Sequence, residues 1–212
     1  MDDLAMTLGA RAEAEAAPQA AKANRPDRAL RVLVGITGAS GAVYALDFLR
    51  RCPGDKFVVA SKWARAVLHS ELGLREEDLD PYVKARFPDS DLSAPFSSGS
   101  NAFDAVVIVP CSTSTAAKIA AGIGDTLITR AAAVALKERR RLILAVRETP
   151  LSTVQLEALH KLSVAGAVIF PLSPPWYGNP KTVDDLVAAT TGKLLRLVGV
   201  ELPGGWREED LE

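Results

Sequence analysis

The chain has 212 residues, 48% of them apolar, and its 25 basic residues are matched by 26 acidic ones. This length fits roughly one domain of ordinary size. The net charge of −1 creates no field that would attract nucleic acid or an anionic membrane surface, and no run of about 18 apolar residues predicts a membrane-spanning helix. The two cysteines, Cys52 and Cys111, are too few for a disulfide framework, which favours the cytoplasm.

Composition divides the chain into three parts. Residues 1–29 are rich in alanine and mixed in charge, so we expect a disordered N-terminal tail. Residues 30–200 carry the regular patterns of one domain, and residues 201–212 form a short C-terminal tail. Acids near the start of the chain, Asp2 and Asp3, argue against a transit peptide.

Short β-branched runs alternate with helix-length amphipathic segments along the domain. This pattern predicts an α/β fold with a doubly wound parallel sheet in three layers, α/β/α. The predicted strands are Arg31–Ile36, Lys56–Ala60, Asp104–Val109, Arg141–Val146 and Ala167–Pro171. The predicted helices are Ala42–Arg51, Lys62–Leu72, Ser114–Ala121, Asp125–Glu138, Ser152–Val164 and Thr182–Val198.

Between residues 73 and 103 the periodicity fails and Asp, Pro and Ser accumulate. We interpret this segment as a long excursion outside the core. Long ordered loops in α/β domains often carry function.

Ligands of open parallel sheets bind beyond the carboxyl ends of the strands, so the residues that follow each strand are the candidate site. A glycine-rich turn, Gly35–Gly41, follows the first strand and resembles a phosphate-binding or flavin-phosphate loop. The alternative is a tight turn in which Ser40 only caps the next helix. The motif alone does not decide between the two.

Hydroxyl groups follow the second and third strands. Ser61 precedes one helix, and the run Ser112–Thr115 opens another. One hydroxyl is enough to cap a helix, so the excess favours a ligand, with a plain loop as the alternative. We expect Cys111 to be a small buried residue and not a reactive thiol.

Charged and aromatic side chains follow the last two strands. Arg147 and Glu148 form either a surface ion pair or a functional pair that binds an anion and moves protons. Trp176 and Tyr177, held between prolines, either line an apolar pocket or pack beneath their loop. Lys137 begins a basic run at a helix end, where positive charge complements the helix dipole, although it could turn inward. The two histidines, His69 and His160, have no second ligand at metal spacing, so we assign both to structure.

The strand-end segments together resemble the UbiX family of flavin prenyltransferases over residues 31–206. The resemblance is carried in order by GITGASGAVYALDFLR, SK, SGS, PCSTST, DTLITRAAAVALKERRRLILAVRETPLS and LEALHKLSVAGAVIFPLSPPWYGNPKTVDDLV, with Lys193 beyond them. It implies a Rossmann-like (flavodoxin-like) flavoprotein that joins the dimethylallyl group of dimethylallyl phosphate to N5 and C6 of reduced FMN without a metal. It also implies a homododecamer with sites between subunits and a product, prenylated FMN, that serves a UbiD-type decarboxylase.

The resemblance also implies roles for single residues. FMN contacts are implied for Gly38, Ala39, Ser40, Ser61, Ser112, Thr113, Ser114, Thr115 and Arg147. Contacts with the prenyl phosphate are implied for Arg130, Lys137, Tyr177 and Lys193, and Trp206 is implied to cover the prenyl group. Ser40, Lys137 and Glu148 are implied as catalytic, with Ser40 and Glu148 relaying protons. Many family members place an aromatic residue of the 73–103 segment near the flavin, and this chain offers Phe87, Phe96 and Phe103 there.

Two other functions remain open at this stage. The cysteine decarboxylases of the same superfamily use an active-site His, an Asn in the loop that here reads PCSTST, and a downstream Cys. This chain has no Cys after Cys111 and no Asn in that loop. A non-catalytic FMN carrier would share the flavin contacts, but it would have no use for a second set of anion-binding residues.

Overall fold

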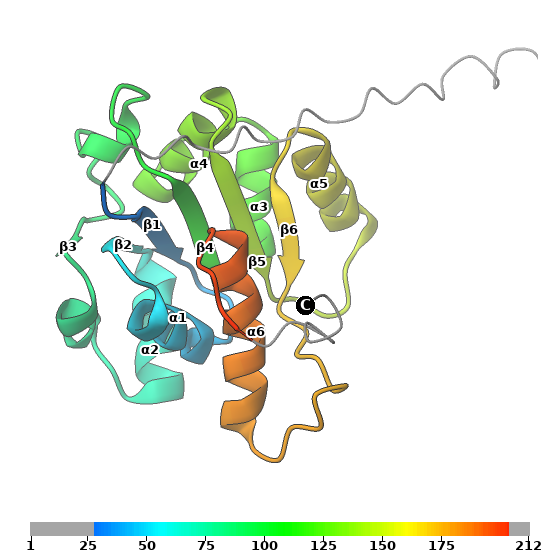
Figure 1. Ribbon diagram of the computed structural model, residues 1–212. Coiled ribbons are helices and arrows are strands. Elements are labelled where there is room, and N and C mark those ends of the chain that lie inside the picture. The colour runs from blue at the N-terminus through cyan, green and yellow to red at the C-terminus, as the bar shows by residue number, and fades with distance from the viewer. Residues whose placement is uncertain (1–27, 204–212) are drawn as a thin grey trace, which may run out of the picture.

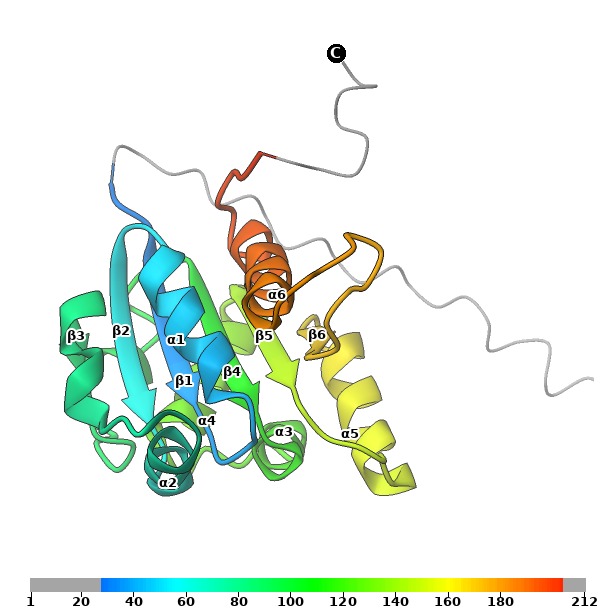
Figure 2. The ribbon, with the colours of Figure 1, turned by 90° about the horizontal axis from the view of Figure 1, so that it is seen from below.

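A computed structural model describes residues 28–203 of the protein, and the sheet at its centre has six parallel strands in the order β3-β2-β1-β4-β5-β6 (Figures 1 and 2). The strands are β1 (Arg31–Ile36), β2 (Asp55–Ala60), β3 (Ala85–Arg86), β4 (Ala105–Cys111), β5 (Arg141–Val146) and β6 (Val168–Pro171). The helices are α1 (Ala42–Arg51), α2 (Lys62–Leu72), α3 (Thr113–Ala120), α4 (Leu127–Lys137), α5 (Thr153–Val164) and α6 (Val183–Leu197). Two short 3₁₀ helices, η1 (Glu76–Tyr82) and η2 (Pro95–Ser97), lie between α2 and β4.

Helices cover both faces of the sheet, as the near-continuous apolar strands predict. One core cluster joins alternate strand residues such as Val34 and Val107 to α1 and α6. The other joins the intervening residues, such as Val106 and Leu144, to α3, α4 and α5. Figure 2 shows α6 on one side of the sheet and α3 and α5 on the other. The predicted doubly wound, three-layer α/β/α fold is confirmed.

Element boundaries follow capping residues that are visible in the sequence. Five of the six α-helices begin after a Ser or Thr whose hydroxyl accepts a hydrogen bond from a backbone amide in the first turn. Ser152 with Gln155 and Thr182 with Asp185 form capping boxes. The five predicted strands and six predicted helices are therefore all present, with ends that differ by no more than two residues.

The prediction that residues 73–103 lie outside the core is wrong. Leu79, Phe96 and Phe103 are buried, and β3 adds a sixth strand at the sheet edge. The ring of Phe96 lies 5.1 Å from that of Phe57 and 5.7 Å from that of Phe103, centroid to centroid. The sequence pattern missed this because 3₁₀ turns and a two-residue strand are too short to show a hydrophobic period.

No helix within residues 28–203 combines the length and the apolar composition needed to cross a membrane.

Candidate functional site

A cavity of about 450 Å³ opens at the carboxyl edge of the sheet, where the turns after β1, β2 and β4 meet the start of α4. This is the edge at which open α/β sheets bind ligands. The lining is formed by Gly38, Ser61, Lys62, Trp63, Asp89, Ser112, Ser114, Thr115, Lys118, Thr126, Ile128 and Thr129. The cavity therefore combines hydroxyls and both signs of charge with apolar surface, to which Trp63 and Ile128 contribute.

The turn between β4 and α3 supplies the predicted run of hydroxyls. Ser112 caps α3 by accepting from the amide of Thr115, and its own amide donates to the hydroxyl of Thr37 over 2.7 Å. Within residues 28–203, the amides of Thr113 and Ser114 have no hydrogen-bond acceptor. The start of α3 thus combines free amide donors, hydroxyls and the positive end of the helix dipole, which suits an anionic or hydroxylated ligand.

Two residues of this turn, Thr113 in the run and Cys111 just before it, do not line the cavity. Thr113 is buried, and its hydroxyl accepts from the side-chain amide of Gln155 at 2.9 Å and donates to Glu148 at 3.5 Å. Cys111 is fully buried, and burial raises the pKa of its thiol to about 12. The thiol is therefore protonated near neutrality and is not a nucleophile, as predicted.

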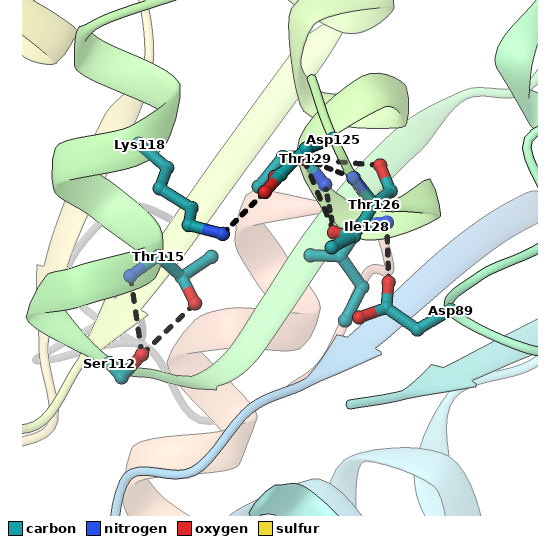
Figure 3. A network of polar contacts seen from close by, with 8 residues as sticks. All are labelled: Asp89, Ser112, Thr115, Lys118, Asp125, Thr126, Ile128 and Thr129. Atoms are coloured by element: carbon teal, nitrogen blue, oxygen red, sulfur yellow. Dashed lines mark hydrogen bonds and ion pairs between the residues drawn. The ribbon is translucent and has the colours of Figure 1, made fainter. Parts of the chain in front are cut away.

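Opposite α3, charged side chains form the rim of the cavity (Figure 3). The ammonium group of Lys118 lies 2.7 Å from a carboxylate oxygen of Asp125, which joins α3 to the turn before α4. Asp89 accepts from the amide of Ile128 at 3.0 Å and so occupies the N-terminus of α4. Sequence reasoning missed Asp89, Lys118, Thr126 and Thr129, because only the folded chain brings the 73–103 segment beside α3 and α4.

The turn between β1 and α1 is held by a carboxylate that the sequence did not reveal. Glu71, near the end of α2, accepts from the amide of Ala42 at 2.8 Å and from that of Gly41 at 3.0 Å, and it is hydrogen-bonded to the Ser40 side chain. Ser40 is not the helix cap, because Gly41 holds that position without a side-chain bond. The α1 amides that appeared available to a phosphate are therefore bonded to Glu71, and Ser40 is held beside them.

The electrostatics of Glu71 favour its charged form. Burial opposes ionisation, but the hydrogen bonds from Ser40, Ala42 and Gly41 and the nearby Arg147 guanidinium outweigh it and lower the pKa of Glu71 below its ordinary value. Arg147 follows β5, so residues from the ends of β1 and β5 and from α2 converge here. Neither Glu71 nor its partnership with Ser40 has a local sequence motif.

Arg147 and Glu148 lie at the carboxyl end of β5. Within the described range they form no ion pair with each other. Glu148 instead accepts from Thr113 and from the amide of Thr149, the latter at 3.0 Å. Arg147 acts electrostatically on Glu71. The interpretation as a simple surface ion pair is thus wrong, and both groups lie at the same edge as Ser40.

The residues assigned to the prenyl phosphate are not brought together within one chain. Arg130, in the first turn of α4, lines a separate cavity of about 520 Å³ with Ser97 and Ser98, and its Nε donates to the Ser97 carbonyl at 3.1 Å. Tyr177 lies on the exposed loop between β6 and α6. Trp206 lies outside the described residues.

Lys137 and Lys193 lie at the opposite, amino edge of the sheet. Lys137 ends α4, next to the start of β5, where it pairs with Glu138 at 3.0 Å and has a side chain that is 67% exposed. Lys193 is in the last two turns of α6, close to Thr191, whose hydroxyl accepts from Arg51 at the end of α1. Neither lysine can reach the Ser40 edge of its own chain.

The described part of the chain contains no candidate metal site. Across residues 28–203 there is no cluster of three or more His, Cys, Asp or Glu side chains that could hold a metal ion. His69 and His160 are exposed on α2 and α5.

Comparison with known proteins places the chain in a family. The Flavoprotein family model matches residues 20–195. A curated relative from Thermoplasma acidophilum, named flavin prenyltransferase UbiX, is 51% identical over 172 residues, which cover 81% of this chain and 96% of the relative.

Two solved structures are also similar. AnUbiX (PadA1), in complex with FMN and dimethylallyl pyrophosphate, is 38% identical with a TM-score of 0.80 and covers 85% of this chain and 100% of its own. A dodecameric FMN-dependent UbiX-like decarboxylase from Escherichia coli O157:H7 is 36% identical with a TM-score of 0.80 and covers 84% and 99%.

Proposed function

The chain belongs to the flavoprotein family, among its UbiX-type flavin prenyltransferases, and from that premise we propose that it transfers a dimethylallyl group from dimethylallyl phosphate to N5 and C6 of reduced FMN. The observation that carries the proposal is the cavity at the carboxyl edge, lined by Ser61, Ser112 and Ser114 after β2 and β4, with the hydrogen-bonded pair of Ser40 and Glu71 at the turn after β1. The cofactor and first substrate is FMN. The alternatives, a cysteine decarboxylase and an FMN carrier, predict no prenyl transfer.

The cavity fits FMN by its chemistry. The free amides of Thr113 and Ser114 and the hydroxyls of Ser61, Ser112 and Thr115 supply donors for a ribityl phosphate chain. We assign these residues, with Gly38, Ala39, Ser40 and Arg147, to flavin binding. Bound reduced FMN supplies a nucleophilic N5 and C6.

The prenyl donor requires cations, because its phosphate leaves with the electrons of the C–O bond while the new bond to N5 forms. We propose that side-chain cations meet the leaving charge. We assign this role to Arg130, Lys137, Tyr177 and Lys193, and we assign the cover over the prenyl group to Trp206.

Proton transfer is assigned to the carboxyl edge. Glu71 holds the Ser40 hydroxyl in a fixed orientation, and Glu148 lies beside Thr113 at the end of the neighbouring strand. A hydroxyl bonded to an ionised carboxylate is poised to accept and return a proton. We therefore propose Ser40 and Glu148 as the proton relay, with Glu71 as the partner that positions Ser40.

The active site is proposed to form between subunits. Lys137 and Lys193 lie at the amino edge and cannot meet Ser40 in the same chain. A heterologous subunit contact pairs two different surfaces, so it can bring the amino edge of one protomer to the carboxyl edge of its neighbour. The dodecameric structure from Escherichia coli supports a homododecamer here.

Two finer assignments complete the proposal. The product, prenylated FMN, is proposed to pass to a UbiD-type decarboxylase, because the similar protein from Thermoplasma acidophilum is named as a flavin prenyltransferase and a modified flavin needs an enzyme that uses it. The cytoplasm is proposed as the location, which the two buried free cysteines support.

The test is an anaerobic incubation of purified protein with reduced FMN and dimethylallyl phosphate in the presence of a chelator. A flavin mass increased by one five-carbon unit, with release of phosphate, is the expected result. A parallel reaction with dimethylallyl pyrophosphate measures donor preference. Bound but unmodified FMN with both donors would contradict the proposed function.

A further inference from the structure

Trp63 is an exposed tryptophan in an unusual position. It is the second residue of α2 and lies at the carboxyl edge of the sheet, where 67% of its surface is exposed. Its side chain lines the cavity of about 450 Å³. The phenylalanines of the 73–103 segment instead pack against one another. Burying exposed aromatic surface is favourable, so the indole is available for an apolar partner in the cavity.

Apart from Trp63 and Ile128, the residues that line the cavity are glycine or carry a hydroxyl or a charge. Of its lining residues in the described range, only Trp63 and Ile128 have large apolar side chains. Ile128 is 2% exposed and packs beneath the floor against Gly35 of β1. A flavin has a polar ribityl phosphate chain and a broad, largely apolar ring system. The hydroxyls and lysines suit the first part, which leaves Trp63 as the broad apolar surface for the second.

Local contacts hold the Trp63 side chain beside the cavity. A Cβ added to Gly38 would lie only 2.6 Å from the Cβ of Trp63, so the absence of a side chain at Gly38 allows this contact. The ammonium group of Lys62 lies 5.4 Å from the indole centroid, within range of a cation–π interaction. Trp63 is therefore held beside the cavity before any ligand arrives.

We propose that Trp63 forms the aromatic wall against which the isoalloxazine ring packs, and that it sets the affinity and orientation of the flavin. The inference rests on the flavin site of the proposed function. Trp63, and not a phenylalanine of the 73–103 segment, is then the aromatic group of the site.

Flavin binding and flavin fluorescence test this inference separately. FMN is titrated into wild-type protein and into the variants Trp63→Phe, Trp63→Ala and Trp176→Phe, and the Kd and the emission of bound flavin are measured. Contact with an indole quenches flavin emission by electron transfer, whereas a phenyl ring does not. Trp176 is as exposed, at 71%, but does not line the cavity, which makes it the matched control.

The expected result separates packing from quenching. Trp63→Phe keeps the Kd within about threefold but brightens the bound flavin several-fold, because a ring remains without an indole. Trp63→Ala weakens binding about tenfold, while its circular dichroism and urea midpoint stay close to wild type. Trp176→Phe changes neither quantity.

Two results would overturn the inference. If Trp63→Phe leaves the emission of bound flavin quenched, the indole does not contact the ring. If Trp63→Ala binds FMN as tightly as the wild type, the wall contributes no affinity. Failure of the wild-type protein to bind FMN at all would instead contradict the flavin site on which the inference rests.

Discussion

The carboxyl and amino edges of the sheet differ in how much of the proposed active site each one forms within a single chain. At the carboxyl edge, Ser40, Glu71 and Ser112 are fixed by hydrogen bonds that link separate strand ends, and the cavity beside them is formed by one chain. At the amino edge, Lys137 and Lys193 lie on the last turns of their helices. Neither lysine lines the cavity at the carboxyl edge. On the proposed assignment, the flavin contacts come from one chain, whereas the prenyl donor takes residues from a second chain.

The largest effect is expected from a substitution of Lys137 at the amino edge. Lys137→Ala should reduce prenyl transfer by about a thousandfold, because a cation that offsets the leaving phosphate is lost in a site that excludes water. The Kd for FMN should stay unchanged, since Lys137 is assigned to the prenyl phosphate and not to the flavin. Steady-state assays of prenyl transfer and FMN titration measure the two quantities.

Arg139→Asn is the matched control for Lys137. It removes a charge from the same basic run, and asparagine tolerates the positive φ of 54° at this position. Its turnover should match that of the wild type. An equal loss in both variants would mean that the general charge of the run matters and that Lys137 has no specific role.

The next largest effect is expected from a substitution of Glu71 at the carboxyl edge. Glu71→Gln should lower turnover by about a hundredfold, because the neutral amide no longer holds Ser40 for proton transfer. Stability against pH gives a second measurement. The pKa of Glu71 is lowered in the folded state, so its ionised form contributes stability above the ordinary Glu pKa, and this contribution is lost as the pH falls through the folded value.

Urea unfolding at a series of pH values measures this contribution. The wild type should lose stability progressively below about pH 4.5, and Glu71→Gln should show a shallower decline there. Parallel curves for the two proteins would contradict the role given to the Glu71 carboxylate.

A smaller effect is expected where Gly38 lies close to Trp63 beside the cavity. Gly38→Ala should weaken FMN binding about tenfold, because the new Cβ would lie 2.6 Å from the Cβ of Trp63 and must displace it. Fluorescence titration measures the change. Gly73→Asn is the control, since Gly73 has a φ of 67° with open space around its Cβ position. Unchanged FMN affinity in Gly38→Ala would show that the packing of Trp63 on Gly38 is unimportant.

The smallest effect distinguishes two neighbouring serines. Ser112→Ala removes the cap of α3 and should lower the free energy of unfolding by about 1 kcal/mol. Ser114→Ala removes an exposed hydroxyl of the cavity and should weaken FMN binding without changing stability. Urea unfolding and FMN titration of both variants measure these quantities. Equal stability losses would contradict the assignment of Ser112 alone as the cap.

Local sequence patterns predicted most of the fold. Apolar strands such as Arg31–Ile36 and capping hydroxyls such as Ser61 determine structure within a few residues, so their elements could be placed from sequence. Phe96 and Phe103 could not be placed in the core, because short 3₁₀ turns show no period.

The candidate site was predictable only where its residues follow strands directly. Ser61, Ser112 and Arg147 do so, and strand order alone places them at one edge. Glu71, Asp89 and Trp63 reach the site through the path of α2 and of the 73–103 segment, which no local pattern specifies. The separation of Lys137 from Ser40 likewise depends on the direction of α4, which places its last turn at the amino edge.

Subunit complementation tests the central claim most directly. Ser40→Ala and Lys137→Ala are each inactive on this account, and their mixed oligomers are prepared by co-expression or by dissociation and reassembly. If a site combines Ser40 of one chain with Lys137 of another, about a quarter of the sites in a random mixture are intact and prenyl transfer returns to that extent. Activity in the mixture no higher than in either variant alone would show that both residues serve the same chain's site and would contradict the account.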